Sequence, residues 1–403
     1  MKMIYKSILL VAVIAMATIF ATSCKDDNDS SGGAPYISYV RITDPKSADS
    51  LLVASGQGQL IAIVGGNLQN TREIWFNDQQ ATSLRATYIT NTSILVNMPS
   101  KIPSVVTNKM KLVFANSDSL LYDFKLTINA PVITSMNCEY VPDGGIATIN
   151  GGYFYLPITV TFPGGVTASS ENDEDSVTIN TANNIITLKV PQGAQPGQLI
   201  IKTNFGAQIS DFWFRDNRNI IEGFDNDGTY DPGTNGSIIT DPGDGDPSLI
   251  NGPYDRVIKP AMGGWEWTQV FARWGAPYCK IPDEAILHPD QYYYKFEVCT
   301  MKPFDANGIR AWVTDPSVQT GTPDGVYYNW MPPFDSQGKW QTVSIPFENF
   351  ASALGSYFPK VLPDGSYFCA FVYCEGGTLN CDMSYDNFRI VPKTIPKPAG
   401  SDY

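Results

Sequence analysis

The sequence predicts an all-β protein that contains three β-sandwiches in a row. Three observations support this fold class. Charged residues are 17% of the chain while aromatic residues reach 12%, a balance that suits sheets better than helical bundles. The segments 60–116 and 147–206 repeat one order of short apolar runs bounded by Gly, Pro or Asn. Beyond Asp216, further short apolar runs alternate with Gly-, Pro- and Asp-rich turns.

The N-terminus has the features of an export signal. Lys2 and Lys6 precede an apolar run, residues 8–20, which is too short to span a bilayer and is typical of a signal peptide. Small residues follow, directly before Cys24. This arrangement resembles a bacterial lipobox, although alanine stands where leucine is more usual at the third position before the cysteine. The resemblance implies removal of residues 1–23 and lipidation of Cys24, and the alternative is ordinary signal cleavage that leaves a free thiol.

Residues 24–34 are predicted to form an acidic, flexible tether, because Asp26, Asp27 and Asp29 stand among polar residues. In lipoproteins of Bacteroidota, such a run after the cysteine resembles the signal for display on the outer face of the outer membrane. A simple solvated tether is the alternative. We therefore expect a lipid-anchored protein of the cell outer membrane that faces the outside. No later stretch is apolar and long enough to predict a transmembrane helix.

Charge and cysteine content narrow the possible partners. A formal net charge of -13 argues against nucleic acid, whose phosphates need a basic surface. His288 is the single histidine and no CxxC spacing occurs, so the sequence predicts no zinc site and no cofactor. Disulfides and buried free thiols both stay open for the six remaining cysteines, which are Cys138, Cys279, Cys299, Cys369, Cys374 and Cys381.

Residues 35–129 and 130–217 are predicted to be two copies of one domain. The pairs Gly65-Gly66 and Gly151-Gly152 each follow an apolar strand, and we expect them to take left-handed conformations in a sharp turn. The two copies resemble IPT/TIG immunoglobulin-like domains. This resemblance implies that they lack chemistry of their own and act as spacers.

Residues 218–403 are predicted to form a jelly-roll-like sandwich. The expected helix spans 347–354, and the expected strands are 294–301, 309–313, 340–345, 367–374 and 384–391. Phe224-Asp225, the run 338–346 and the run 385–390 resemble parts of jelly-roll carbohydrate-binding modules. The whole order of domains resembles the surface glycan-binding lipoproteins of Bacteroidota polysaccharide-utilisation systems, with a C-terminal domain of the xyloglucan-binding type.

This resemblance implies that residues 218–403 bind a plant or cereal polysaccharide without transforming it. A β-glucan, either xyloglucan or mixed-linkage glucan, is the first expectation, and glucomannan stays open. The binding would capture the polysaccharide for uptake and degradation by other proteins. The implied partners are an outer-membrane transporter and a companion glycan-binding protein.

Aromatic residues that face solvent are the candidates for sugar binding, because their flat rings stack on the C–H faces of sugars. Strand alternation places Ile309, Ala311 and Val313 in the core and the residues between them outside. The aromatic-rich run 326–334 lies between turn segments and is expected to be an exposed loop, or else a plug over the sandwich. A strand at 265–269 would present both of its tryptophans on one face. The candidate residues are Trp330, Trp312, Tyr327, Tyr328, Trp265, Trp267, Arg310 and Asn329.

Other interpretations of the C-terminal domain stay open beside glycan binding. A glycoside hydrolase would need two facing carboxylates, and Glu266 with Glu297 or Glu375 offers them. A protein-binding surface adhesin is a further alternative. Asp225, Asp227 and Asp386 could hold a structural calcium ion or simply stabilise turns, and no metal is predicted. Trp274 and Trp340 are expected to pack internally.

Overall fold

The structure is a computed structural model that describes residues 33–47, 50–225, 233–273, 281–305, 308–314, 325–331, 333–361 and 367–395. The chain forms two compact units, of which the first ends at Ile128 and the second begins at Asn129. The second unit contains two sandwiches, called here the second sandwich and the C-terminal sandwich. Within the described ranges, no helix combines the length and the apolar character that crossing a membrane requires.

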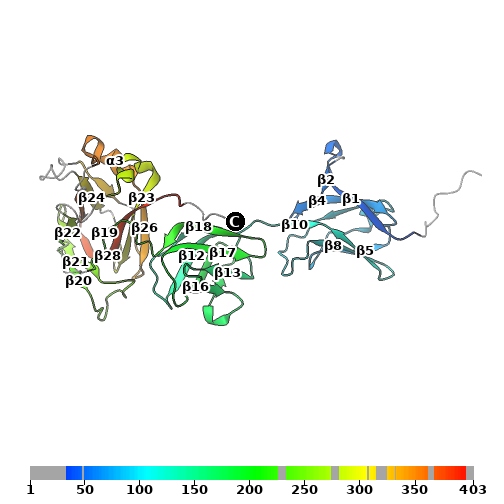
Figure 1. The fold of residues 1–403 in the computed structure, drawn as a ribbon, viewed down its shortest axis with the longest axis horizontal. Helices are drawn as coiled ribbons and strands as arrows, with labels where there is room; N and C mark the ends of the chain where they lie inside the picture. Colours follow the sequence, from blue (N-terminus) through cyan, green and yellow to red (C-terminus); the bar gives the residue numbers. More distant parts are fainter. Residues whose placement is uncertain are drawn as a thin grey trace, which may run out of the picture. The chain divides into compact units, whose positions relative to one another are not determined.

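The first unit is a β-sandwich with an apolar core of its own between two four-stranded sheets (Figure 1). One sheet contains, in spatial order, β2 (Leu51–Leu52), β1 (Tyr36–Ile42), β4 (Leu60–Gly66) and β7 (Ser93–Asn97). The other contains β6 (Gln79–Gln80), β5 (Thr71–Phe76), β8 (Lys109–Phe114) and β9 (Ser119–Asp123). A short parallel pair, β3 (Ala54–Gly56) with β10 (Lys125–Thr127), and the 3-10 turns η1 (Pro45–Ser47) and η2 (Ala86–Tyr88) complete the unit.

The second sandwich repeats this design. Its first sheet contains β11 (Val132–Met136), β12 (Ile146–Gly152), β16 (Ile185–Lys189) and β15 (Thr178–Ile179). Its second sheet contains β14 (Thr167–Ser169), β13 (Ile158–Thr161), β17 (Gly197–Thr203) and β18 (Gly206–Phe214), and η3 (Asp173–Asp175) lies in a connection. Ile149 on β12, Ile186 on β16 and Ile201 on β17 are fully buried, as alternation along half-buried strands predicts.

The two glycine pairs are equivalent in the two copies, but the expected reason for them is wrong. Both pairs are the last residues of a strand and lie opposite a β-bulge in the neighbouring strand. A Cβ on Gly65 would lie 2.0 Å from the carbonyl oxygen of Tyr36, and one on Gly151 would lie 1.8 Å from that of Val132. Close backbone approach therefore requires glycine at Gly65 and Gly151, the first residue of each pair. The left-handed residue is the one after each pair.

The C-terminal sandwich packs a six-stranded sheet on a four-stranded one (Figure 1). The β28 sheet contains β20 (Ser237–Ile239), β21 (Tyr254–Met262), β28 (Leu379–Pro392), β23 (Tyr292–Thr300) and β26 (Gln341–Pro346), and β19 (Ile220–Glu222) also pairs with β28. The β27 sheet contains β22 (Trp267–Arg273), β27 (Tyr367–Tyr373), β24 (Gly308–Thr314) and β25 (Tyr328–Trp330). The helices are α2 (Asp283–Leu287) and α3 (Glu348–Leu354), with the 3-10 turns η4 (Pro289–Gln291) and η5 (Gly355–Tyr357).

The predicted all-β fold class is confirmed, and so is the short helix expected after residue 347. The five strands expected in the C-terminal domain all exist. The largest difference is β28, which begins five residues before the predicted start, at Leu379 rather than Ser384. Its residues from Cys381 to Val391 are nearly all buried. One face of β28 meets the sandwich core, and on the other Arg389 meets Glu139 of the second sandwich while Asn387 meets Asn251.

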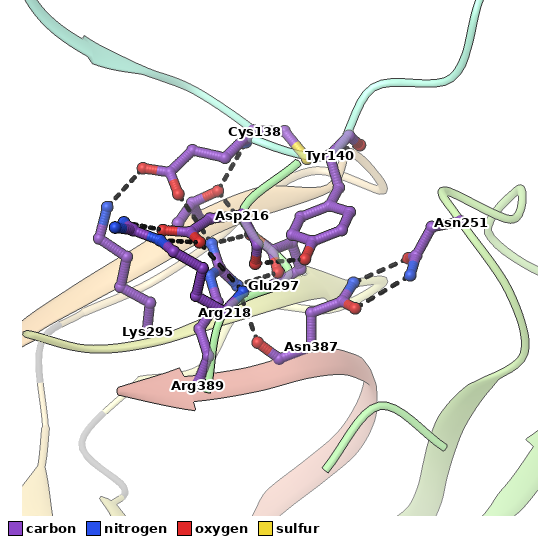
Figure 2. Close-up of polar contacts among 11 residues, drawn as sticks. Cys138, Tyr140, Asp216, Arg218, Asn251, Lys295, Glu297, Asn387 and Arg389 are labelled. Carbon is purple, nitrogen blue, oxygen red and sulfur yellow. Dashed lines mark hydrogen bonds and ion pairs between the residues drawn. The ribbon is translucent and has the colours of Figure 1, made fainter. Parts of the chain in front are cut away.

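A cluster of buried charges joins the second sandwich to the C-terminal sandwich. Arg389 on β28 donates hydrogen bonds to Glu297 on β23 at 2.7 and 3.0 Å and to Glu139 of the second sandwich at 2.7 Å. Lys295 donates to the other oxygen of Glu139 at 2.5 Å. We call these four residues the interdomain charge cluster. Figure 2 shows Lys295, Glu297 and Arg389 facing the segment that carries Cys138 and Tyr140.

Backbone and aromatic contacts surround the interdomain charge cluster. Thr342 on β26 donates from its backbone N–H to the carbonyl oxygen of Asn137, and its hydroxyl accepts from the Glu139 N–H, both at 2.8 Å. Trp340 packs against the core of the second sandwich and donates from its indole N–H to Ser248 at 2.8 Å. Trp340 was expected to pack internally, and it is instead partly buried at the contact between two sandwiches. These contacts tie the second sandwich to the β28 sheet and leave the outer side of the β27 sheet uncovered by it.

Candidate functional site

The outer side of the β27 sheet carries aromatic residues that face away from the core. In the sheet register, Trp267 on β22 lies beside Tyr373 on β27, and Phe371 lies beside Arg310 on β24. The ring of Trp267 meets Phe371 edge to face, with ring centroids 5.2 Å apart. We call Trp265, Trp267, Tyr327, Phe371 and Tyr373 the aromatic face.

Two tryptophans of the aromatic face are well exposed. Trp265 is 68% exposed and Trp267 is 48% exposed. The expectation that both belong to one strand is wrong, since β22 begins at Trp267 and Trp265 occupies a turn with a left-handed backbone (φ 71). The backbone N–H of Trp265 donates to the carbonyl oxygen of Cys374 at 2.7 Å, which fixes this turn against the end of β27.

A polar cluster lies beside these rings, and it consists of Arg310, Asn329 and Glu375. Glu375 Oε1 accepts from Arg310 Nη2 and from Asn329 Nδ2, each at 2.8 Å, and from Arg310 Nε at 3.2 Å. The Arg310 guanidinium lies 3.6 Å from the centroid of the Tyr373 ring and 4.2 Å from that of Tyr327. Cation–π contacts and charge-assisted hydrogen bonds therefore hold the cluster in one geometry.

The polar cluster explains a glycine at the start of β24. A Cβ on Gly308 would lie 2.0 Å from Asn329 Oδ1, so only glycine leaves room for the amide at this place. Arg310 and Asn329 are register partners across β24 and β25, which brings both predicted residues to the same side of the sheet. Of the predicted set, the structure thus brings Arg310, Asn329 and Tyr327 together, on the same side of the sheet as Trp267 but separated from it by β27.

The prediction that Trp330 faces solvent is wrong. Trp330 is only 8% exposed and belongs to the core of the C-terminal sandwich. Its ring lies parallel to Phe304 at 6.0 Å and edge to face with Phe296 at 5.7 Å. The expected loop is instead partly β25, and pairing with Ile309 turns Trp330 to the inner side. Ile309, Ala311 and Val313 are buried, as strand alternation predicted.

Tyr328 also faces inward and not toward the aromatic face. It pairs with Ala311 across β24 and β25, and its ring lies 4.6 Å from Phe350 of α3. Because this ring packs partly against the core, Tyr328 is poorly placed to stack on a sugar. Trp312 lies in β24 opposite Cys369, and its side chain lies outside the described residues, as does all of Trp274.

Phe371 and Tyr373 were not among the predicted residues, and Glu375 was considered only as a carboxylate of a hydrolase. Their strand was predicted, but its alternating positions are apolar on both sides, so alternation alone did not tell which side faces solvent. Ala370 and Val372 are fully buried. The available signal was the alternation of Ala370 and Val372 with aromatic residues, although aromatic rings also fill the core of this sandwich.

Each of the carboxylates considered for hydrolysis has a structural partner. Glu297 is fully buried in the interdomain charge cluster, on the β28 sheet. Glu375 is held by Arg310 and Asn329, and Glu266 accepts the Gly263 N–H at 2.7 Å within the turn of Trp265. These contacts favour structural roles for the three carboxylates.

Metal and disulfide chemistry find little support in the described part of the chain. It contains no group of three or more His, Cys, Asp or Glu side chains placed to hold a metal ion. Asp227 and Cys279 lie outside it. Burial raises the pKa of Asp386 well above its ordinary value, and nearby Glu297 raises it further. Cys138, Cys299, Cys369, Cys374 and Cys381 are buried free thiols, which answers for these five the question that the sequence left open.

Comparison with known proteins identifies the family of the C-terminal sandwich. Residues 214–392 match the family described as surface glycan-binding protein B xyloglucan binding domain. The C-terminal domain belongs to this family. The match covers the whole β27 sheet, and therefore the aromatic face and the polar cluster.

The full chain is also similar to solved surface glycan-binding proteins. One is surface glycan-binding protein PbSGBP-B from Prevotella bryantii, whose crystal structure matches with a TM-score of 0.62 and 25% sequence identity. The match covers 90% of this chain and 99% of that one. SGBP-B from a complex xyloglucan utilization locus in Bacteroides uniformis shares the fold at 20% identity and a TM-score of 0.50, over 89% of this chain and 100% of that one.

A curated relative supports the assignment of the repeated domains. An IPT/TIG domain-containing protein of Bacteroides ovatus is 26% identical over 228 residues, which are 53% of this chain and 46% of that protein. The chain therefore spans less than half the length of this relative. The two repeated sandwiches agree with the IPT/TIG immunoglobulin-like resemblance of their sequences.

Proposed function

We propose that the chain binds a β-glucan, such as xyloglucan or mixed-linkage glucan, at the cell surface and does not hydrolyse it. The observation that carries this proposal is the aromatic face on a domain of the xyloglucan-binding family. Exposed Trp265 and Trp267 offer rings for the C–H faces of glucose units, and the polar cluster offers hydrogen-bonding groups beside them. The open side of a sheet suits a long polymer, which must enter and leave at both ends.

Affinity electrophoresis tests the binding. The mature chain is run in gels that contain xyloglucan, mixed-linkage glucan, glucomannan or no polysaccharide, and we expect retardation in at least one β-glucan gel. Incubation with the same polymers should release no new reducing ends. Release of reducing ends would instead support the hydrolase alternative with Glu266. Normal migration in all polysaccharide gels would contradict glycan binding and favour the adhesin alternative.

We propose further that Cys24 anchors the chain in the outer membrane by lipidation, facing outward, where it delivers glycan to an outer-membrane transporter and a companion binding protein. The lipobox-like segment before Cys24 and the acidic run after it support this proposal. Cys24→Ala should move the protein from the membrane fraction to the soluble fraction of cells. Asp26→Ala together with Asp27→Ala and Asp29→Ala should keep it membrane-bound but reduce labelling at the surface. Unchanged fractionation of the Cys24 variant would contradict the anchor.

A further inference from the structure

The polar cluster carries both signs of charge at the edge of the aromatic face. Arg310 and Glu375 form an ion pair with 2.8 Å between Nη2 and Oε1, and their side chains are 12% and 22% exposed. Arg310 lies on β24, and Glu375 lies two residues after the end of the neighbouring strand β27. The pair is thus part of the sheet surface on which the glycan is proposed to lie.

An arginine at this place would ordinarily favour acidic sugars. A guanidinium presents parallel N–H donors that fit the two oxygens of a carboxylate, and it stacks well between aromatic rings. Arg310 has the stacked environment, since tyrosine rings lie 3.6 and 4.2 Å from its guanidinium carbon. With no counter-charge, Arg310 would therefore be a receptor for the carboxylate of a uronic acid.

Glu375 occupies that position instead. Its Oε1 accepts hydrogen bonds from Nε and Nη2 of Arg310, and a further hydrogen bond from Asn329 keeps the carboxylate in place. A uronate at this Nε–Nη2 edge of the guanidinium would have to displace Glu375 and would leave its charge partly buried and unpaired, which is costly. The uronate would also approach a group of its own sign. An uncharged glucan does not need to displace Glu375 and is not repelled by its charge. It can contact the outward-facing oxygens of the polar cluster and the rings of the aromatic face.

We propose that Glu375 is a specificity-determining residue, which neutralises Arg310 and so restricts the aromatic face to uncharged glycans. This inference rests on the proposed function, because it concerns the selectivity of the same face. It predicts that loss of the Glu375 charge, rather than any new contact, opens the site to uronic acids. Glu375→Gln is the direct test, since the amide oxygen can still accept from Arg310 and Asn329.

The experiment compares two polymers in affinity gels of equal ionic strength, mixed-linkage β-glucan and polygalacturonate. For Glu375→Gln we expect the ratio of retardation by polygalacturonate to that by β-glucan to increase about tenfold, the size expected for one hydrogen-bonded charge pair. Raising the salt concentration should reduce this gain, because salt screens a partly exposed charge. Glu375→Ser removes the same charge and should act in the same direction. Melting temperatures identify variants that are folded.

Two controls separate a local effect from a change in net charge. Glu284→Gln on α2 removes one negative charge from a side chain that is 68% exposed, and its ratio should stay at the wild-type value. Arg310→Gln combined with Glu375→Gln should also stay there, because the receptor for the uronate is gone. An equal increase of the retardation ratio in Glu375→Gln, Glu284→Gln and the double variant would overturn the inference. Folded Glu375 variants with an unchanged ratio would also overturn it. Wild-type protein that no β-glucan retards would contradict the proposed function itself.

Discussion

Arg389 of the C-terminal sandwich donates from Nη2 to Glu139 Oε2 of the second sandwich at 2.7 Å, and the two side chains are 0% and 5% exposed. Lys295 shares the same carboxylate. One acidic residue of the second sandwich is therefore the counter-charge for two buried cations of the glycan-binding domain. The second sandwich is thus a structural part of that domain, and the description of it as a spacer is incomplete.

Glu139→Gln is expected to destabilise the second unit by about 3 kcal/mol or more, because removing one partner leaves buried charges uncompensated. The measurement is urea-induced unfolding of the second unit. Glu348→Gln is the matched control, since the Glu348 side chain is 40% exposed where it pairs with Lys393. That exposed pair should contribute about 1 kcal/mol or less. Equal losses of unfolding free energy in both variants would show that the buried contacts of Glu139 contribute no more to stability than the exposed pair does.

The contacts of Glu139 with Arg389 and Lys295 determine which fragments of the chain should be stable. A fragment of residues 129–403 keeps Glu139 and should bind the polysaccharide as tightly as the mature chain. A fragment of residues 218–403, which the sequence analysis took as the binding domain, loses the partner of Lys295 and exposes Trp340. We expect it to melt well below the longer fragment in calorimetry. Equal melting temperatures would mean that the interdomain charge cluster is dispensable.

The interdomain charge cluster also shows what the sequence could not predict. Alternation and repeats are local patterns, and they predicted the three sandwiches and the longer strands of the last one, but not β19, β20, β21 or β25. Arg389 and Glu139 are 250 residues apart, and no local pattern indicates that two distant charges meet. In the same way, Gly65 was recognised as special, but the approach of the Tyr36 carbonyl that requires it belongs to strand pairing.

The candidate site was predictable only in part, for a related reason. Arg310 was placed correctly because β24 alternates aliphatic residues with others. Trp330 was misplaced because β25 has three residues between turn-forming segments, too few to show a period. Density of aromatic residues cannot distinguish a plug of the core from a surface for sugar, since both need large flat rings.

Asp255 should make stability depend on pH. Burial raises the pKa of Asp255 to about 8, and the hydrogen bond from Thr234 only partly opposes this effect. The folded state then keeps a proton that the unfolded chain releases above about pH 4. The contribution of Asp255 to the free energy of unfolding therefore falls as pH rises from about 4 to about 8, and it levels off at higher pH.

Asp255→Asn should remove this contribution, because the amide is neutral at every pH and can still accept from Thr234. We expect the variant to exceed the wild type by about 2 kcal/mol or more at pH 8 and to match it near pH 4. Urea unfolding of both proteins between these pH values is the measurement. Asp335→Asn, a change at an exposed turn residue, is the control. Parallel curves for wild type and Asp255→Asn would show that Asp255 is ionised in the fold.

The exposed and buried tryptophans should separate binding from stability. Trp267→Ala removes a ring that is 48% exposed, and a stacked aromatic residue at a binding hot spot contributes about 2 kcal/mol or more, roughly a thirtyfold change in affinity. Its melting temperature should change little. Trp330→Ala empties a site among Phe296, Phe304 and Phe334 and should cost about 3 kcal/mol of stability or more.

Calorimetric titration with a glucan oligosaccharide, beside thermal melts, measures both quantities for each variant. Titration is carried out well below the melting temperature of Trp330→Ala, so that any binding lost there by unfolding is separated from loss of contact. Trp265→Ala, at 68% exposure, should behave as Trp267→Ala does. Trp312 stays a prediction of strand alternation, and the same two measurements on Trp312→Ala assign it to one class or the other. If Trp267→Ala and Trp265→Ala both bind as the wild type does, the glycan lies elsewhere than on the aromatic face, even if the protein binds it tightly.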